Sequence, residues 1–137
     1  VFNTETFKNN LGFLDVLSKF EVNWIVLAGF LLKIPEYIIE GFQGKIINIH
    51  PALLPKYGGK GMYGMNVHRS VIENNEAESG ISIHYVNKNY DEGKMIFQAR
   101  CAINAGDKPE DLANKIHILE HQHYPRVIEE TIKNSNQ

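Results

Sequence analysis

The chain is short of the features that mark several classes of protein. Its 137 residues include a single cysteine, Cys101, which has no partner for an internal disulfide, and disulfides are the usual staple of small secreted domains. No signal-peptide pattern opens the sequence. These two observations predict a cytoplasmic protein.

Long hydrophobic runs and an excess of positive charge are also missing. No apolar stretch approaches the roughly 20 residues that span a bilayer, and the formal net charge is -2 with acidic and basic residues interspersed. A protein that follows nucleic-acid phosphates normally carries a basic patch. We therefore expect neither a membrane nor a nucleic acid as a partner.

The chain does have enough apolar residues for a core. Hydrophobic residues make up 43% of it and charged residues 22%, a balance typical of one compact domain rather than of a disordered or fibrous segment. The sequence contains no internal repeat and no low-complexity tract. We predict a single domain over residues 1–137.

Four short apolar runs, bounded by glycine and turn residues, predict β-strands. They span residues 24–28, 45–49, 81–86 and 95–99. A short helix from Pro35 to Glu40 separates the first two, so these should pair in parallel through a right-handed crossover, whereas the last two should pair antiparallel. The predicted fold class is α/β: a Rossmann-like, mostly parallel twisted sheet with helices on both faces and an antiparallel edge.

Three further helices are predicted around this sheet. The first begins at Asn3 or Thr4, and the second is capped by Asn66. The third starts at a capping box over Asp107–Glu110. It should break at Pro125, which cannot donate to the helix, and resume as a short terminal helix.

Glycine and proline are concentrated between the second strand and the second of these helices. The residues are Pro51, Pro55, Gly58, Gly59, Gly61 and Gly64. Neither a helix nor a strand tolerates this density, and a loop of such length is uncommon in a compact domain. The segment is either a binding loop or lid, or a mobile surface loop.

Two polar side chains end the second predicted strand, where Asn48-Ile49-His50 runs into Pro51. Residues two apart in a strand point to the same face, so Asn48 and His50 should lie together. If Asp91 reaches them, the set offers an amide donor, a group that exchanges protons near neutral pH, and a carboxylate to orient it. Such a set suits attack on a carbonyl-like carbon, because donors aimed at a developing oxyanion stabilise it.

Each of these residues also has a plainer interpretation. A polar side chain at a strand end often satisfies loop backbone alone, and aspartate at a position such as 91 is a common turn residue. Cys101 lies just after the last predicted strand, and a buried inert thiol is a simpler interpretation of it than a nucleophile. Only the combination of Asn48, His50 and Asp91 favours a site.

A different chemistry competes in the last predicted helix. His117-Ile118-Leu119-Glu120-His121 fits the H-x-x-E-H pattern of inverted zinc peptidases, and His117 and His121 would share a helix face. A third ligand would have to come from Glu129 or Glu130. The alternatives are a zinc-binding hydrolase and a solvated histidine cluster, and we expect the cluster, with no metal bound.

Several segments together resemble the phosphoribosylglycinamide formyltransferase family, folate-dependent enzymes of purine biosynthesis. They are Val26–Phe30, Asn48–Tyr57, Ser82–His84 with Asp91, and Glu120-His121 before Tyr124-Pro125. The resemblance covers nearly the whole chain. It implies direct transfer of a formyl group from the co-substrate 10-formyltetrahydrofolate to the amine of glycinamide ribonucleotide, by a monomer or weak homodimer.

The same resemblance implies roles for particular residues. Asn48 and a protonated His50 would hold the formyl oxygen as it becomes an oxyanion, while Asp91 would support the charged imidazole and help a bound water carry the amine proton to the leaving folate nitrogen. The folate pocket would be formed by Leu31, Leu32, Lys33, Ile34, Asn48, Asn87, Lys88, Asn89, Tyr90 and Asp91.

Four other residues are placed around this centre by the resemblance. Pro51 and Glu120 would contact the glycinamide substrate, although Glu120 could equally be a solvated helix carboxylate. His84 would support the site through hydrogen bonds. His68, just inside a helix, is expected at the surface or as support for the loop.

Related members of the family keep the chemistry and change the substrate. Methionyl-tRNA formyltransferase and formyltetrahydrofolate deformylase share the Asn-x-His core, and an inactive folate-binding relative is a further alternative. The family begins with about two strand-helix units, on the order of 60 residues, which hold a substrate phosphate at a helix N-terminus. Those units have no counterpart here, so a polypeptide beginning at Val1 is expected to fold poorly or to lack turnover.

Overall fold

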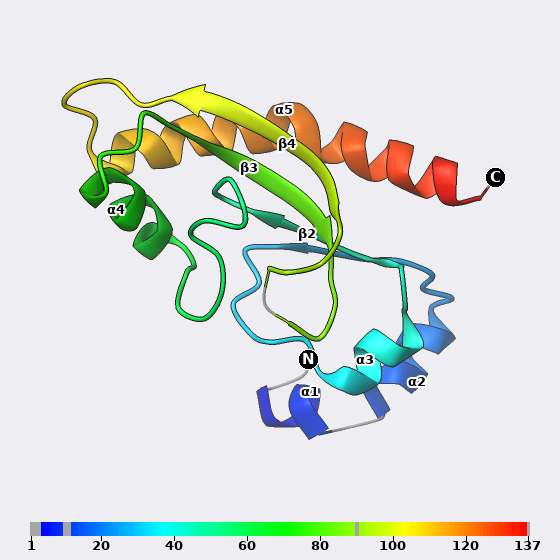
Figure 1. Ribbon diagram of the computed structural model, residues 1–137. Coiled ribbons are helices and arrows are strands. Elements are labelled where there is room, and N and C mark those ends of the chain that lie inside the picture. Colours follow the sequence, from blue (N-terminus) through cyan, green and yellow to red (C-terminus); the bar gives the residue numbers. More distant parts are fainter. Residues whose placement is uncertain (1–3, 10–11, 90, 137) are drawn as a thin grey trace.

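The computed structural model describes residues 4–9, 12–89 and 91–136 (Figure 1). The elements are α1 (Thr4–Asn9), α2 (Gly12–Lys19), β1 (Ile25–Ala28), α3 (Glu36–Gly41), β2 (Ile46–His50), α4 (Met65–Glu73), β3 (Glu78–Tyr85), β4 (Met95–Ala102) and α5 (Pro109–Ser135). All four predicted strands are present. β3 and β4 extend beyond the predicted ranges.

The four strands form one sheet in the order β1, β2, β3, β4. β1 and β2 are parallel, whereas β2 with β3 and β3 with β4 are antiparallel. The predicted α/β class with an antiparallel edge is confirmed. Only one of the three pairings in the described ranges is parallel. Parallel neighbours need a crossover connection, and α3 lies in the crossover between β1 and β2.

Alternation of side chains along β2 divides the core in two. Ile47 and Ile49 pack in a cluster covered by α4 and α5, whereas Ile46 packs in a second cluster with residues of α2 and α3. In Figure 1, α5 follows β3 and β4 at the top, and α2 and α3 lie together at the lower right. Because strand residues alternate between faces, Asn48 and His50 share the face of Ile46, opposite α5.

The first predicted helix corresponds to α1 and α2. Thr4 is the first residue of α1, and Asn3 lies outside the described residues. The ring of Phe7 meets the rings of Phe13 and Phe30 edge-on, with centroids 5.5 Å apart in each pair. These contacts fix α1 against α2 and against the loop that follows β1.

The predicted cap of α4 is wrong by two residues. The helix begins at Met65 with Gly64 in the cap position, so Asn66 lies in the first turn. Its amide donates to the carbonyl oxygen of Gly61 at 3.2 Å. Asn66 therefore stabilises the glycine-rich loop rather than the helix start.

The capping box of α5 is shifted by one residue from the prediction. The cap residue is Lys108, whose backbone N–H donates to the carboxylate of Asp111 at 2.9 Å. Asp107 instead accepts from the backbone N–H of Asn104 at 2.8 Å. Asp107 therefore belongs to the turn before the helix, and Asp111 rather than Glu110 accepts the hydrogen bond from the cap residue.

α5 is one continuous helix of 27 residues. The predicted break at Pro125 is wrong, although a proline inside a helix costs about 3 kcal/mol. Tyr124 and Val127, on either side of it, are buried in the core, and this packing offsets the lost backbone bond. Among the helices of the described segments, none is long and apolar enough to cross a membrane.

Tyr124 ties α5 to the two parallel strands. Its buried hydroxyl donates to the carbonyl oxygen of Leu27 at 2.6 Å and lies 3.4 Å from that of Ile47. Burial, together with the nearby Glu120 carboxylate, raises the pKa of Tyr124. The hydroxyl therefore stays protonated and holds the helix beneath β1 and β2.

Replacing Tyr124 with phenylalanine should lower the free energy of unfolding by about 1–2 kcal/mol, because a buried donor is lost while the ring is kept. Denaturant unfolding followed by circular dichroism would measure the change. Tyr63→Phe, at an exposed tyrosine, is the matched control. Equal stability of the two variants would contradict the role of the Tyr124 hydroxyl.

Candidate active site

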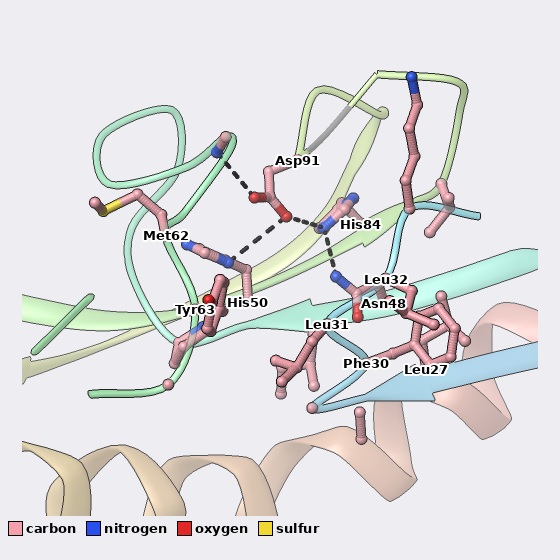
Figure 2. Close-up of a pocket in the computed structure, with 18 of the residues that line it drawn as sticks. Leu27, Phe30, Leu31, Leu32, Asn48, His50, Met62, Tyr63, His84 and Asp91 are labelled. Carbon is pink, nitrogen blue, oxygen red and sulfur yellow. Dashed lines mark hydrogen bonds and ion pairs between the residues drawn. The ribbon is translucent and has the colours of Figure 1, made fainter. Parts of the chain in front are cut away.

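A cavity of about 580 Å³ opens at the end of β2 (Figure 2), a volume typical of small-molecule sites. Its walls come from the loop after β1, the end of β2, the glycine-rich loop, α4, the β3–β4 connection and α5. The lining residues are 27–34, 48–51, 59–65, 86–89, His68, His84, Asp91, Ala113, His117 and Glu120.

The structure brings the predicted site residues together around this cavity. Those in its lining are Leu31, Leu32, Lys33, Ile34, Asn48, His50, Pro51, His84, Asn87, Lys88, Asn89, Asp91 and Glu120. Tyr90 lies outside the described residues. The long loop that the sequence left open as a binding segment or a mobile excursion forms one wall.

Asn48 lies beside His84 because β2 and β3 pair in that register. Asn48 Nδ2 is 3.3 Å from His84 Nε2, and His84 Nδ1 is 2.9 Å from the carbonyl oxygen of Tyr85. A neutral imidazole has one donor and one acceptor nitrogen. Because a carbonyl only accepts, Nδ1 carries a proton toward Tyr85, and Nε2 lies between the Asn48 amide and the Asp91 carboxylate.

His50 is almost completely buried, with 4% of its surface exposed. Its Nε2 lies 2.7 Å from the carbonyl oxygen of Tyr57, and since a carbonyl only accepts, Nε2 carries the proton. Nδ1 faces Asp91, 3.6 Å from Oδ1. That distance is longer than a hydrogen bond, so the Asp91 carboxylate acts on the imidazole through its own charge, which favours protonation of the ring.

Asp91 collects contacts from three segments of the chain (Figure 2). Oδ1 lies 3.6 Å from His50 Nδ1 and 3.7 Å from His84 Nε2, while Oδ2 accepts from the backbone N–H of Gly59 at 3.0 Å. Burial acts to raise the pKa of Asp91, but these neighbours together lower it below its ordinary value of 3.8. Asp91 is therefore a carboxylate at neutral pH.

Burial and a nearby carboxylate act in opposite directions on His50. Burial lowers the pKa of His50 below its ordinary 6.5 and outweighs Asp91 and the Tyr57 carbonyl, which both raise it. His50 is therefore mainly neutral at neutral pH in this structure. Asp91 favours the charged ring, but the imidazole loses more by leaving water than it gains from this carboxylate.

Residues 3–128 match the protein-family model described as Formyl transferase. The chain belongs to the formyl transferase family. Phosphoribosylglycinamide formyltransferase, chloroplastic, of Arabidopsis thaliana is 45% identical over 123 residues, which cover 87% of this chain and 42% of that protein. Phosphoribosylglycinamide formyltransferase of Escherichia coli K12 is 38% identical over 104 residues, covering 76% and 47%.

A solved structure of the family supports the fold directly. The crystal structure of phosphoribosylglycinamide formyltransferase from Bacillus halodurans superposes with a TM-score of 0.82 at 29% identity, covering 91% of this chain and 62% of that one. This match confirms the formyltransferase fold. The chain spans less than half the length of the Arabidopsis thaliana and Escherichia coli proteins named above.

The polar centre of the candidate site lies between apolar walls. Figure 2 shows Leu27, Phe30, Leu31 and Leu32 on one side of it and Met62 and Tyr63 on the other. Several of these large side chains remain exposed, Leu31 by 56% and Tyr63 by 47%. Exposed apolar side chains gathered at a cavity mark a binding surface. Sequence reasoning missed Met62 and Tyr63, because an irregular loop has no periodicity to predict its contacts.

Sequence reasoning also misplaced His68. It lines the cavity with 4% of its surface exposed, and its Nδ1 has no hydrogen-bond partner within the described residues. The expectation of a surface histidine is therefore wrong. Burial, followed by nearby His117 and His50, lowers the pKa of His68. Its spacing to Val71 and Ile72 is helical and could have indicated the buried face.

The histidines of α5 offer no metal centre. His117 and His121 are both exposed, and His117 Nδ1 lies 3.2 Å from Glu120 Oε2. In the part of the chain that the structure describes, no group of three or more His, Cys, Asp or Glu side chains could hold a metal ion. The zinc alternative thus has no ligand set to support it.

The lowered pKa values of His50 and His68 predict that the protein loses stability on acidification. Both histidines bind protons more weakly when folded, so their contribution is complete above the unfolded value of 6.5 and is lost as pH falls through the lower folded values. Thermal unfolding between pH 8 and 5 would measure the decline.

His68→Gln should flatten part of that decline, because glutamine does not titrate. His121→Gln is the matched control at an exposed histidine of α5. A decline of the same steepness in wild type and His68→Gln would show that burial of His68 does not contribute.

Proposed function

We propose that this formyltransferase transfers the formyl group of 10-formyltetrahydrofolate to the amine of glycinamide ribonucleotide, a step of purine biosynthesis. The observation that carries the proposal is the convergence of Asn48, His50 and Asp91 at the polar centre of one apolar-walled cavity. The names of its relatives support the choice of acceptor.

The folate would lie between the apolar walls. Residues 31–34 and 87–91 line one part of the cavity, apart from Tyr90, which is not described. A flat heterocycle suits this surface, because its faces can pack against leucine and phenylalanine while its edges bond to backbone groups of the two loops. The formyl group would then reach Asn48 and His50.

The acceptor would approach from the side of α5. Pro51 and Glu120 both line the cavity, and Glu120 adds a carboxylate at 27% side-chain exposure, paired with His117. A carboxylate in this position would attract the amine end of the glycinamide. It would orient that amine toward the formyl carbon.

The reaction needs no covalent enzyme intermediate. The lone pair of the neutral amine attacks the formyl carbon, and the carbonyl electrons move to oxygen. The N–H donor of Asn48 would stabilise the resulting oxyanion, and one such donor is worth about 3 kcal/mol. The bond from carbon to the folate nitrogen then breaks, and that nitrogen takes the proton that the amine loses.

His50 would take up a proton from solvent as the oxyanion forms and would return it when the carbonyl re-forms. The oxyanion adds a second negative charge next to the Asp91 carboxylate, and two negative charges near Nδ1 favour the imidazolium over the neutral ring. Burial, which keeps His50 neutral beforehand, also strengthens its bond to the oxyanion. Asp91 would hold the charged ring and, through a water molecule, carry the proton from amine to folate.

Asn48→Ala, His50→Ala and Asp91→Asn should each lower kcat/KM by about 10²–10⁴-fold, because each removes a donor or a proton carrier. The assay follows loss of the formyl group from 10-formyltetrahydrofolate with glycinamide ribonucleotide present. Asn114→Ala, at an exposed position on α5, is the control. Unchanged rates in the three site variants would remove the mechanism.

The acceptor itself can be tested with the same assay. We expect formyl loss to require glycinamide ribonucleotide and to continue in the presence of a chelator. Equal loss without any amine acceptor would indicate a deformylase, and formylation of methionyl-tRNA would indicate the tRNA enzyme. Stoichiometric zinc together with a hydrolase activity abolished by chelation would favour the zinc alternative.

A further inference from the structure

We propose that Tyr57 and Glu76 are positioning residues that hold the His50 imidazole in a single tautomer from outside the cavity. The mechanistic importance of this tautomer rests on the proposed function, although its existence does not. Neither Tyr57 nor Glu76 is among the residues that line the cavity. They reach the site through the Tyr57 carbonyl oxygen, which contacts His50.

The backbone of Tyr57 provides the contact with His50. Its carbonyl oxygen accepts from Nε2 at 2.7 Å, yet the residue has a φ of +59°. That conformation is uncommon for a bulky residue and is a form of backbone strain. Surrounding contacts must therefore hold Tyr57 in place.

The side chain of Tyr57 supplies those contacts. Its hydroxyl donates to Glu76 Oε1 at 2.8 Å, and Lys56 Nζ donates to the same oxygen at 3.2 Å. Desolvation and the bond to Glu76 raise the pKa of Tyr57 to about 12, so the hydroxyl keeps its proton. The ring also packs against the main core cluster. Glu76, between α4 and β3, thus anchors the residue whose carbonyl meets His50.

The tautomer of His50 decides whether the Nδ1 atom that faces Asp91 carries a proton or is free to accept one. While Nε2–H is bonded to Tyr57, Nδ1 is the nitrogen that faces Asp91 and can take up a proton. If the carbonyl moved away, a neutral ring could place its proton on Nδ1 and donate to Asp91. Nδ1 would then no longer be available as an acceptor. The anchor on Tyr57 therefore preserves the form of His50 that the reaction uses.

The other groups around His50 come from three elements. Asp91 faces it from the β3–β4 connection, His84 from β3, and His68 from α4. Tyr57→Phe changes none of these side chains and leaves the ring of residue 57 in the core. A change in His50 in this variant would therefore report the position of the Tyr57 carbonyl.

The test is nitrogen-15 NMR of the His50 imidazole across pH, with steady-state kinetics on the same proteins. Wild type should show the Nε2–H tautomer above its pKa. Tyr57→Phe should show a mixture of tautomers, a lower His50 pKa because the carbonyl bond favours the charged ring, and a kcat reduced about tenfold with little change in KM. Tenfold corresponds to about 1.4 kcal/mol, the size of one ordinary hydrogen bond.

Three further variants separate positioning from general damage. Glu76→Ala should reproduce Tyr57→Phe, whereas Glu76→Gln keeps an acceptor for the hydroxyl and should restore both kcat and the tautomer. Lys56→Met removes the other partner of Glu76 and should leave His50 unchanged. The His84 signals, measured in the same spectra, report whether the site has kept its fold.

An unchanged His50 tautomer and pKa in Tyr57→Phe would overturn the inference, whether or not kcat falls. Failure of wild type to transfer formyl would overturn the proposed function alone, because the NMR titration does not depend on turnover.

Discussion

The antiparallel register between β2 and β3 is the constraint on which the site depends. It sets Asn48 opposite His84 and His50 opposite Ser82. A slip of one residue would turn Asn48 and His50 into the core and Ile47 and Ile49 out of it. Ile47 is fully buried and Ile49 nearly so, which makes such a slip costly. The hydrophobic effect on one face of the strand thereby fixes the polar geometry on the other.

The same register also fixes the start of the glycine-rich loop. The Ser82 hydroxyl donates to the carbonyl oxygen of Ala52 at 2.6 Å and accepts from the backbone N–H of Leu54 at 2.9 Å. Further along, a Cβ on Gly58 would lie 2.6 Å from the Leu54 side chain and 3.2 Å from Cβ of Asp91. A larger residue at position 58 would therefore press on the side chains of Leu54 and Asp91. An irregular segment is thus held by polar contacts to the sheet, not by regular structure of its own.

Much of this arrangement could be predicted from local sequence pattern. Apolar runs located the strands, and the two-residue spacing of Asn48 and His50 placed them on one face. The features that local pattern did not predict depend on contacts between segments that are far apart in the sequence. The packing of Tyr124 against β1 and β2 keeps α5 intact through Pro125, and the desolvation that leaves His50 neutral comes from several elements folded around it. The spacing of residues in the sequence predicts neither the packing of Tyr124 nor the desolvation of His50.

A buried neutral histidine beside a buried carboxylate makes ligand recognition depend on proton uptake. An anionic compound placed where the formyl oxygen develops its charge would bring a proton onto Nδ1 of His50, whereas a neutral compound of the same shape would not. Above the His50 pKa, the affinity for the anion would then fall by about tenfold for each unit of pH. The site would distinguish the transition state from the ground state by charge, with the solvent supplying the proton.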